Sequence, residues 1–324
     1  MAIISASRRT DIPAFFAEWF MTRVRECYFY RINPFNTNQV SGFSLAPEDV
    51  DAIVFWTKNP GPLLPHLREL DERGLHYYFQ FTLNPYGELF ESHVPPLTHR
   101  LATFRELSER LGPHRVIWRY DPIILSDQTP VAWHLEQVAA LAEALNGATG
   151  RLVISFLDFY GKVNRRLAGL ERSQGLKLYD IAADRHRDEL WTLATGFHRI
   201  AAGHGMSVFT CSEEADMAEI GIRKGSCING DLIRELFGEG REYRKDKHQR
   251  GACGCVASVD MGIYNTCRFQ CAYCYANMSP KLIDSNLRKH NPVGPSLIHD
   301  YPEPVKIVRE KSTCPALCQQ SLFE

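Results

Sequence analysis

The sequence has no apolar run near the ~20 residues that a membrane-spanning helix needs, so we expect no membrane insertion. Its first residues, MAIISASRR, lack the charged region and long apolar stretch of a secretory signal, which predicts a cytoplasmic protein. Net charge is also nearly absent, at −1 with 12 histidines besides, which argues against a surface that binds nucleic acid throughout. No internal repeat or low-complexity segment stands out.

What the chain does contain is a large apolar fraction and many cysteines. Its 324 residues are 44% hydrophobic, enough for one large α/β domain or a barrel with an appended piece. Ten cysteines in a chain expected in the cytoplasm favour metal binding or catalysis over disulfides.

Short β-branched and aromatic runs alternate with amphipathic segments, the pattern of a parallel sheet or barrel. The predicted strands are 3–6, 52–56, 77–83, 116–120, 152–157 and 207–210. The predicted helices are 13–27, with Asp11 as N-cap, and 97–111, 133–145 and 189–202. We therefore predict an α/β fold, specifically a partial TIM-like parallel β/α barrel.

Polar residues follow each predicted strand. In α/β barrels the loops at the carboxyl ends of the strands build the active site, which makes Arg119, Asp121 and Lys58 candidate catalytic residues. Asn84 and Asp158 belong to the same rim and suggest a polar ligand. For any single cluster, a wet loop without a catalytic role explains the polarity equally well.

The most specific feature is a CxxxCxxC run formed by Cys267, Cys271 and Cys274. Three thiolates on a short loop suit three irons of a 4Fe-4S cluster, which leaves the fourth iron open to chelate S-adenosylmethionine. Zinc is the alternative, but zinc sites usually combine a CxxC pair with a second pair of ligands. Tyr273, just before the last cysteine, also fits the iron–sulfur interpretation.

This run resembles the signature of the radical S-adenosylmethionine superfamily, although there it normally lies near the start of the barrel. Here a possible strand at 257–264, the cysteine loop and a helix-like segment at 279–289 follow the order of that superfamily's first βα unit. We infer a circular permutation that places this unit beside the strand at 3–6. Together, SASRRTD, WTKNP, CxC and CxxxCxxCYAN look like an uncharacterised bacterial family with a radical S-adenosylmethionine-like motif.

The domain organisation predicted from this resemblance has four segments. They are a barrel body at 1–215, a cysteine-bearing insertion at 216–256, the cluster-binding unit at 257–290 and a tail at 291–324.

The resemblance also implies which residues contact S-adenosylmethionine. Tyr273, Tyr275 and Asn277 would line its adenine side, with loop packing as their alternative role. The SASRRTD segment would replace the superfamily's second strand end, which holds the methionine amino group.

Within that segment the candidates are Ser7, Arg8, Arg9 and Asp11. Arginine suits a carboxylate, so Arg8, Arg9 or Arg119 would bind the methionine carboxylate, while Asp11 would offset its ammonium. Helix capping and a surface ion pair are the alternative for Arg9 and Asp11.

The remaining cysteines raise the question of a second site. Cys211, Cys227, Cys253 and Cys255 would fully ligate a second 4Fe-4S cluster, although a lone buried cysteine also serves as a small apolar residue. Cys27 is expected to be structural. For Cys314 and Cys318 three roles stay open, namely a cross-link within the C-terminal tail, zinc binding or a contribution to a cluster.

The favoured function is therefore an oxygen-sensitive radical S-adenosylmethionine enzyme acting on a polar small molecule, peptide or natural-product precursor. Such an enzyme implies an electron donor such as flavodoxin or ferredoxin. The basic segment 241–250 keeps a nucleic-acid substrate open. Two more functions fit the same cysteines, namely transfer of a different group from S-adenosylmethionine and a zinc-stabilised binding module without catalysis.

Overall fold

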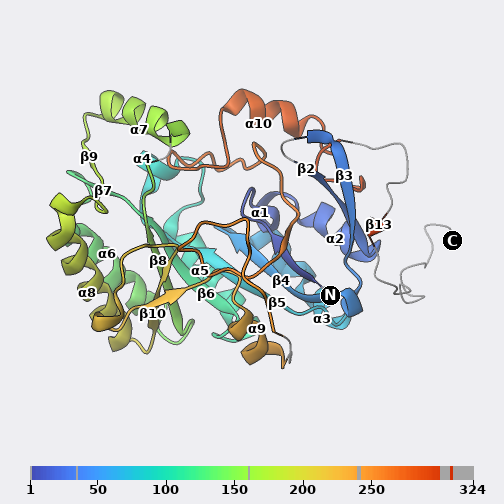
Figure 1. The fold of residues 1–324 in the computed structure, drawn as a ribbon, viewed down its shortest axis with the longest axis horizontal. Helices are drawn as coiled ribbons and strands as arrows, with labels where there is room; N and C mark the ends of the chain where they lie inside the picture. Colours follow the sequence, from blue (N-terminus) through green and yellow to red (C-terminus); the bar gives the residue numbers. More distant parts are fainter. Residues whose placement is uncertain (1, 34–35, 160, 239–241, 300–306, 309–324) are drawn as a thin grey trace. The chain divides into compact units, whose positions relative to one another are not determined.

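The structure is a computed structural model that describes residues 2–33, 36–159, 161–238, 242–299 and 307–308. Its main element is an eight-stranded sheet with the order β11-β10-β8-β6-β5-β4-β1-β12 (Figure 1). The strands are β1 (Ala2–Ala6), β4 (Val50–Thr57), β5 (Tyr77–Thr82), β6 (Val116–Ile123), β8 (Arg151–Phe156), β10 (Ser207–Cys211), β11 (Arg223–Gly225) and β12 (Val259–Asp260).

The fold is thus mixed α/β, and all six predicted strands are present in this sheet. The strand pairs whose register is described are parallel, as buried apolar runs predict. The predicted barrel is not confirmed. In the described part of the chain the strand order ends at β11 and β12, and no closed barrel is found.

The chain divides into two compact units. Unit 1 comprises Met1–Tyr78, Ser258–Arg268 and Ala276–Glu324, and unit 2 comprises Phe79–Ala257 and Phe269–Tyr275. The CxxxCxxC run is therefore shared, with Cys267 in unit 1 and the other two cysteines in unit 2.

In unit 1, the strand before the cysteine loop lies parallel beside β1, pairing Ile4 with Val259 and Ser5 with Asp260. This confirms the adjacency on which the predicted permutation depends. The strand is only two residues long and does not extend over the predicted 257–264; the Gly262 N–H bonds the Asp260 carboxylate.

The predicted helix at 13–27 is two helices, α1 (Ile12–Phe15) and α2 (Ala17–Arg25), because Phe16 leaves the helical conformation with φ −137°. Asp11 is the N-cap of α1, as predicted. On α2, Trp19 and Phe20 are buried, which confirms the predicted apolar face.

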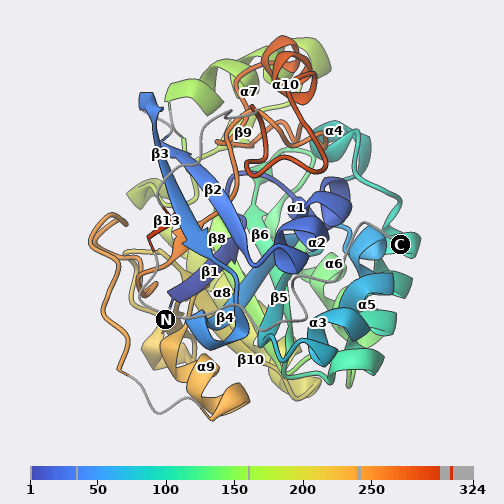
Figure 2. The ribbon, with the colours of Figure 1, turned by 90° about the vertical axis from the view of Figure 1, so that its right-hand side faces the viewer.

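Unit 1 also contains elements that were not predicted. A long antiparallel hairpin joins β2 (Tyr28–Asn33) to β3 (Asn36–Ser44), and β13 (Ile307–Val308) pairs with β3 (Figure 2). Its helices further along the chain are α3 (Leu67–Glu72) and α10 (Pro280–Leu287), and its 3-10 helices are Pro47–Asp49 and Gly61–His66.

In unit 2 the predicted helices are present, and α6 lies beside α8 (Figure 1). The helices are α4 (Gly87–Glu91), α5 (Leu97–Leu111), α6 (Val131–Ala144), α7 (Gly161–Gln174), α8 (Arg187–Gly203) and α9 (Gly230–Phe237). Its other elements are the strand pair β7 (Leu125–Ser126) and β9 (Leu178–Tyr179) and the 3-10 helices Asp184–His186 and Ala218–Ile220. None of the described helices is long and apolar enough to cross a membrane.

Candidate functional site

The end of β12 in unit 1 is fastened to the segment that follows β1. Asp260 is 6% exposed, and its carboxylate accepts the Ser5 hydroxyl at 2.8 Å, the Arg8 backbone N–H at 2.9 Å and the Gly262 N–H at 2.9 Å. Three donors on one buried carboxylate fix its position. The segment leading to the cysteine loop is therefore held against SASRRTD.

Gly262 makes this contact very close. A Cβ at Gly262 would lie 1.8 Å from Ser7 Oγ, so only glycine fits there. The Ser7 hydroxyl oxygen in turn accepts the backbone N–H groups of Arg9 at 2.9 Å and Thr10 at 3.3 Å. Ser7 thus has a structural role in shaping the loop, and its predicted cofactor contact stays a prediction.

Asp11 has both carboxylate oxygens in use. Oδ1 accepts the Ala14 N–H at 3.0 Å, and Oδ2 accepts the Lys58 N–H at 2.7 Å. Burial raises the pKa of Asp11 to about 7, although these hydrogen bonds oppose the rise. The capping alternative is therefore realised, whereas pairing with a ligand ammonium stays a prediction.

The two arginine side chains of SASRRTD differ in how strongly neighbouring groups hold them. Arg8 donates to Ser258 Oγ at 3.1 Å and lies 3.8 Å from the Asp260 carboxylate. Arg9 is half-buried, stacks on the Tyr264 ring at 5.1 Å, and makes a long 3.4 Å hydrogen bond to the Gly262 carbonyl. Arg9 is therefore the better candidate for a carboxylate ligand, because its guanidinium has the weaker described polar contacts.

The unit 1 part of the cysteine loop is closed by backbone contacts. Cys267 is a half-buried thiol outside any disulfide, and its carbonyl accepts from Asn277 Nδ2 at 2.8 Å. The Asn265 N–H donates to the Ala276 carbonyl at 2.9 Å. Asn277, 3% exposed, therefore shapes the loop, and its contact with adenine stays a prediction.

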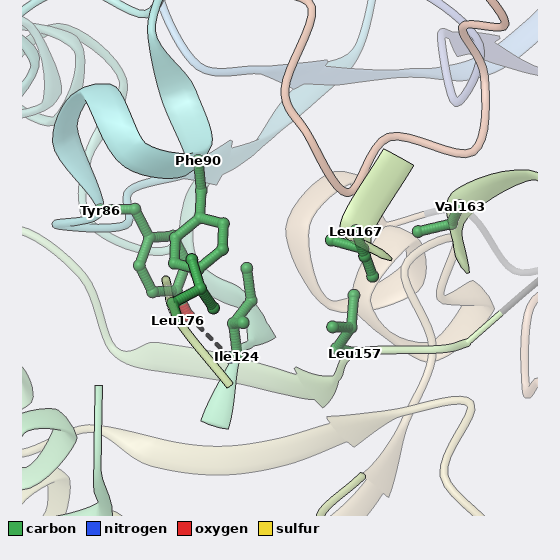
Figure 3. Packing of buried hydrophobic residues seen from close by; sticks show 7 residues of the cluster. All are labelled: Tyr86, Phe90, Ile124, Leu157, Val163, Leu167 and Leu176. Carbon is green, nitrogen blue, oxygen red and sulfur yellow. Dashed lines mark hydrogen bonds between the residues drawn. The ribbon is translucent and has the colours of Figure 1, made fainter. Parts of the chain in front are cut away.

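In unit 2, Cys271 is a buried thiol and Cys274 a half-buried one, joined by a turn in which the Cys274 N–H donates to the Cys271 carbonyl at 3.0 Å. Ala272 and Tyr273 between them pack against an apolar cluster. The cluster, shown in Figure 3, consists of Tyr86, Phe90, Ile124, Leu157, Val163, Leu167 and Leu176. The core of unit 2 thus positions these two thiols.

A buried polar network continues from Tyr273. Its hydroxyl donates to the Glu91 carboxylate, whose other oxygen lies 3.6 Å from Arg100 Nη1. The side chains of Glu91 and Arg100 are 0% and 3% exposed. Burial, with Glu91 as the next cause, raises the pKa of Tyr273 well above its usual value. Tyr273 therefore has a packing role, and its contact with adenine stays a prediction. Tyr275 is 51% exposed.

Arg119 and Asp121, both predicted catalytic residues, form an ion pair. Arg119 is 4% exposed and also donates to Cys227 Sγ at 2.9 Å and Gln80 Oε1 at 3.3 Å. Burial tends to lower the pKa of Arg119, but Asp121 and the neighbouring thiols keep it well above its usual value. Its donors already have partners, which makes it a weaker candidate for a carboxylate ligand; Asp121 also accepts the Ser155 hydroxyl.

The other predicted rim residues have different surroundings within their own units. Asn84, fully buried, accepts the Asp121 N–H at 3.0 Å and so joins the Arg119 pair. Asp158 lies further out in an ion pair with Arg250 at 2.9 Å. Lys58 belongs to unit 1, where its described hydrogen bond uses the backbone N–H.

The four cysteines predicted to form a second site do come together in unit 2. Cys211 Sγ lies 2.9 Å from Cys227 Sγ, and Cys255 contacts both Cys227 and Cys253 through its thiol. Across the described residues, however, no group of three or more His, Cys, Asp or Glu side chains has an arrangement that holds a metal ion. Cys27 is disulfide-bonded, and Cys314 and Cys318 fall outside the described ranges.

Glu213, which follows β10, was not among the predicted site residues, although its place after a strand end was a usable signal. Its Oε1 accepts the Phe156 N–H at 3.0 Å. Burial, with smaller contributions from Asp158 and Asp121, raises its pKa from 4.5 to about 7, against the effects of Phe156 and Arg250. A carboxyl group that titrates near neutral pH is suited to general acid–base chemistry.

Glu213 also makes stability depend on pH. Above about pH 4.5 the unfolded chain ionises this carboxyl while the folded chain keeps it protonated, so stability falls until about pH 7 and then levels off. Glu213→Gln, which keeps the acceptor for Phe156, is expected to be about 1–3 kcal/mol more stable than the wild type at pH 8 and equal to it at pH 4. Urea unfolding at both pH values measures this. The exposed neighbour variant Glu214→Gln should show no such difference, and a pH-independent effect of Glu213→Gln would contradict the assignment.

A family model described as "Domain of unknown function (DUF1848)" matches residues 3–276. The matched range includes the three cysteines of CxxxCxxC and the four cysteines of unit 2. No curated protein and no solved structure matches the chain.

Proposed function

The chain belongs to the DUF1848 family, and from this premise we propose that it is a radical S-adenosylmethionine enzyme of the cytoplasm. The observation that carries the proposal is the set of three thiols outside any disulfide, Cys267, Cys271 and Cys274, on the loop that follows the strand beside β1. Thiolates are the ligands that iron–sulfur clusters take, so the donor set fits a 4Fe-4S cluster. When bound, the cluster supplies the electron that cleaves S-adenosylmethionine.

The chain's own residues would bind and orient the cofactor. Arg9 would hold the methionine carboxylate, since its guanidinium has only one long described hydrogen bond. Tyr275 would stack on the adenine, because its ring is half exposed next to Cys274. Asp260 and Gly262 would keep Arg9 in place through the close contact with SASRRTD.

The substrate class follows from the polar residues of unit 2. Asp121 has a quarter-exposed side chain, and Glu213 titrates near neutral pH, so a polar small molecule or peptide is favoured. The electron would come from a flavodoxin or ferredoxin.

The test uses the full-length protein, purified without oxygen and reconstituted with iron and sulfide. A brown protein that binds about four irons at the motif and releases 5'-deoxyadenosine from S-adenosylmethionine under reductant supports the proposal. A protein that binds no iron, or one that binds iron without cleaving the cofactor, contradicts it. Methylthioadenosine or S-adenosylhomocysteine as the product would instead indicate transfer of another group.

A further inference from the structure

Three of the four thiols of unit 2 come from parts of the chain outside regular helices and strands, and the fourth is the last residue of a strand. Cys211 ends β10, Cys227 follows β11, and Cys253 and Cys255 belong to a hairpin held by a bridge between Lys245 and Val256. This hairpin is anchored at Cys255 itself, whose carbonyl accepts the Asp246 N–H at 2.9 Å. A cross-link between such segments would stabilise their folded arrangement, because it lowers the conformational entropy of the unfolded chain.

A disulfide is not that cross-link here. None of the four cysteines is disulfide-bonded, and the 2.9 Å between Cys211 Sγ and Cys227 Sγ exceeds the ~2.05 Å of a disulfide bond. Three of the four residues are buried, and Cys211 is half-buried. Neutral thiols behave as small apolar side chains. Four of them packed together would therefore stabilise the protein no better than ordinary apolar residues.

Two hydrogen-bond donors lie close to sulfurs of this group. Arg119 donates a hydrogen bond to Cys227 Sγ at 2.9 Å, and the Ile228 N–H approaches Cys255 Sγ at 3.5 Å. Donors aimed at sulfur, one of them a buried guanidinium, offset the negative charge of a metal–thiolate group.

The spacing of the sulfurs decides between a cluster and a single ion. Around one tetrahedral ion with ~2.3 Å bonds, thiolate sulfurs lie about 3.8 Å apart. In a 4Fe-4S cluster each cysteine binds a different iron, so its ligand sulfurs lie further apart than that. The 2.9 Å contact of Cys211 with Cys227 is closer than either arrangement and must open by about 0.9 Å for a single ion. A cluster needs a larger opening between these two sulfurs.

We propose that Cys211, Cys227, Cys253 and Cys255 bind one zinc ion in a tetrahedral four-thiolate site that fastens the loops of unit 2. Four sulfur ligands select zinc or iron, and the close Cys211–Cys227 contact favours the single ion, which needs the smaller change at that pair. This site replaces the second 4Fe-4S cluster expected from the sequence. It is independent of the proposed radical chemistry, since it shares no ligand with the CxxxCxxC loop.

The test measures metal in the full-length protein purified from cells grown with zinc. We expect one zinc ion per chain by elemental analysis, and less than a fifth of that in Cys255→Ser. The matched variant Cys271→Ser should keep its zinc while losing cleavage of S-adenosylmethionine, so the two proposals fail separately. Zinc retained by Cys255→Ser, or absent from the wild type, would overturn the site.

Two further measurements need only the wild-type protein, so they test the zinc site even if Cys255→Ser does not fold. Replacement of zinc by cobalt(II) is expected to give the intense visible bands and thiolate charge-transfer absorption of a tetrahedral four-sulfur site. A weak spectrum of oxygen and nitrogen ligands would contradict the proposal. Reconstitution that yields about eight irons per chain, in place of four irons and one zinc, would show that the site holds a cluster.

Discussion

Replacing Cys271 with alanine is expected to remove the iron bound at the CxxxCxxC loop and to reduce 5'-deoxyadenosine formation to the level without enzyme. The loop supplies three ligands, and two thiolates cannot hold a cluster that has lost its third protein ligand. Iron content should fall from about four per loop to near zero. Anaerobic reconstitution, iron analysis and chromatography of the cofactor products measure both effects.

The loss should occur in a folded protein. Cys271 is 5% exposed, but the change removes only one sulfur atom, and Ala272 keeps its N–H bond to the Phe90 carbonyl. A far-ultraviolet spectrum and urea midpoint close to wild type would show this. Met278→Ala is the matched control, since Met278 follows the motif, is 53% exposed and contacts solvent. A Cys271→Ala protein that keeps both its iron and its activity would contradict the proposed function.

The sheet could be predicted because its strands are short apolar runs that are recognisable in the sequence itself. The runs that became β4 and β5 are almost wholly buried and apolar, so their sequence could be read without tertiary information. The β2–β3 hairpin was missed since β3 has the sequence NTNQVSGFS, in which polar residues and glycine dominate. Its pairing with β2 is a tertiary effect that no local pattern shows.

The candidate site could be predicted only where its residues lie close together in the sequence. Three cysteines within eight residues are recognisable as a ligand set, whereas Cys211 and Cys255 are 44 residues apart and both reach Cys227 only through the fold. The residues that hold the loop were not predicted for the same reason. Asp260 is one aspartate among many until β12 pairs with β1, and Glu91 acquires its role when Tyr273 reaches it.

Arg100→Met is expected to destabilise the protein by about 3–5 kcal/mol, the cost of leaving one member of a buried ion pair without its partner. The Glu91 carboxylate would remain buried after losing the guanidinium 3.6 Å away. Arg100 also donates to the carbonyls of Pro95 at 2.9 Å and Asn84 at 3.0 Å, and both would lose a donor. Methionine preserves most of the side-chain volume, so the effect reports charge and hydrogen bonding instead of a cavity.

The same helix offers the control. Arg110 also lies on α5, but its side chain is 47% exposed and pairs with Glu106 across one helical turn. Arg110→Met should therefore cost less than about 0.5 kcal/mol. Urea unfolding of both variants at pH 7 compares them directly, and a loss below about 1 kcal/mol in Arg100→Met would contradict the buried pair. The double variant Arg100→Met with Glu91→Gln should recover part of the lost stability, because the remaining charge is then removed while the introduced amide oxygen still accepts from Tyr273.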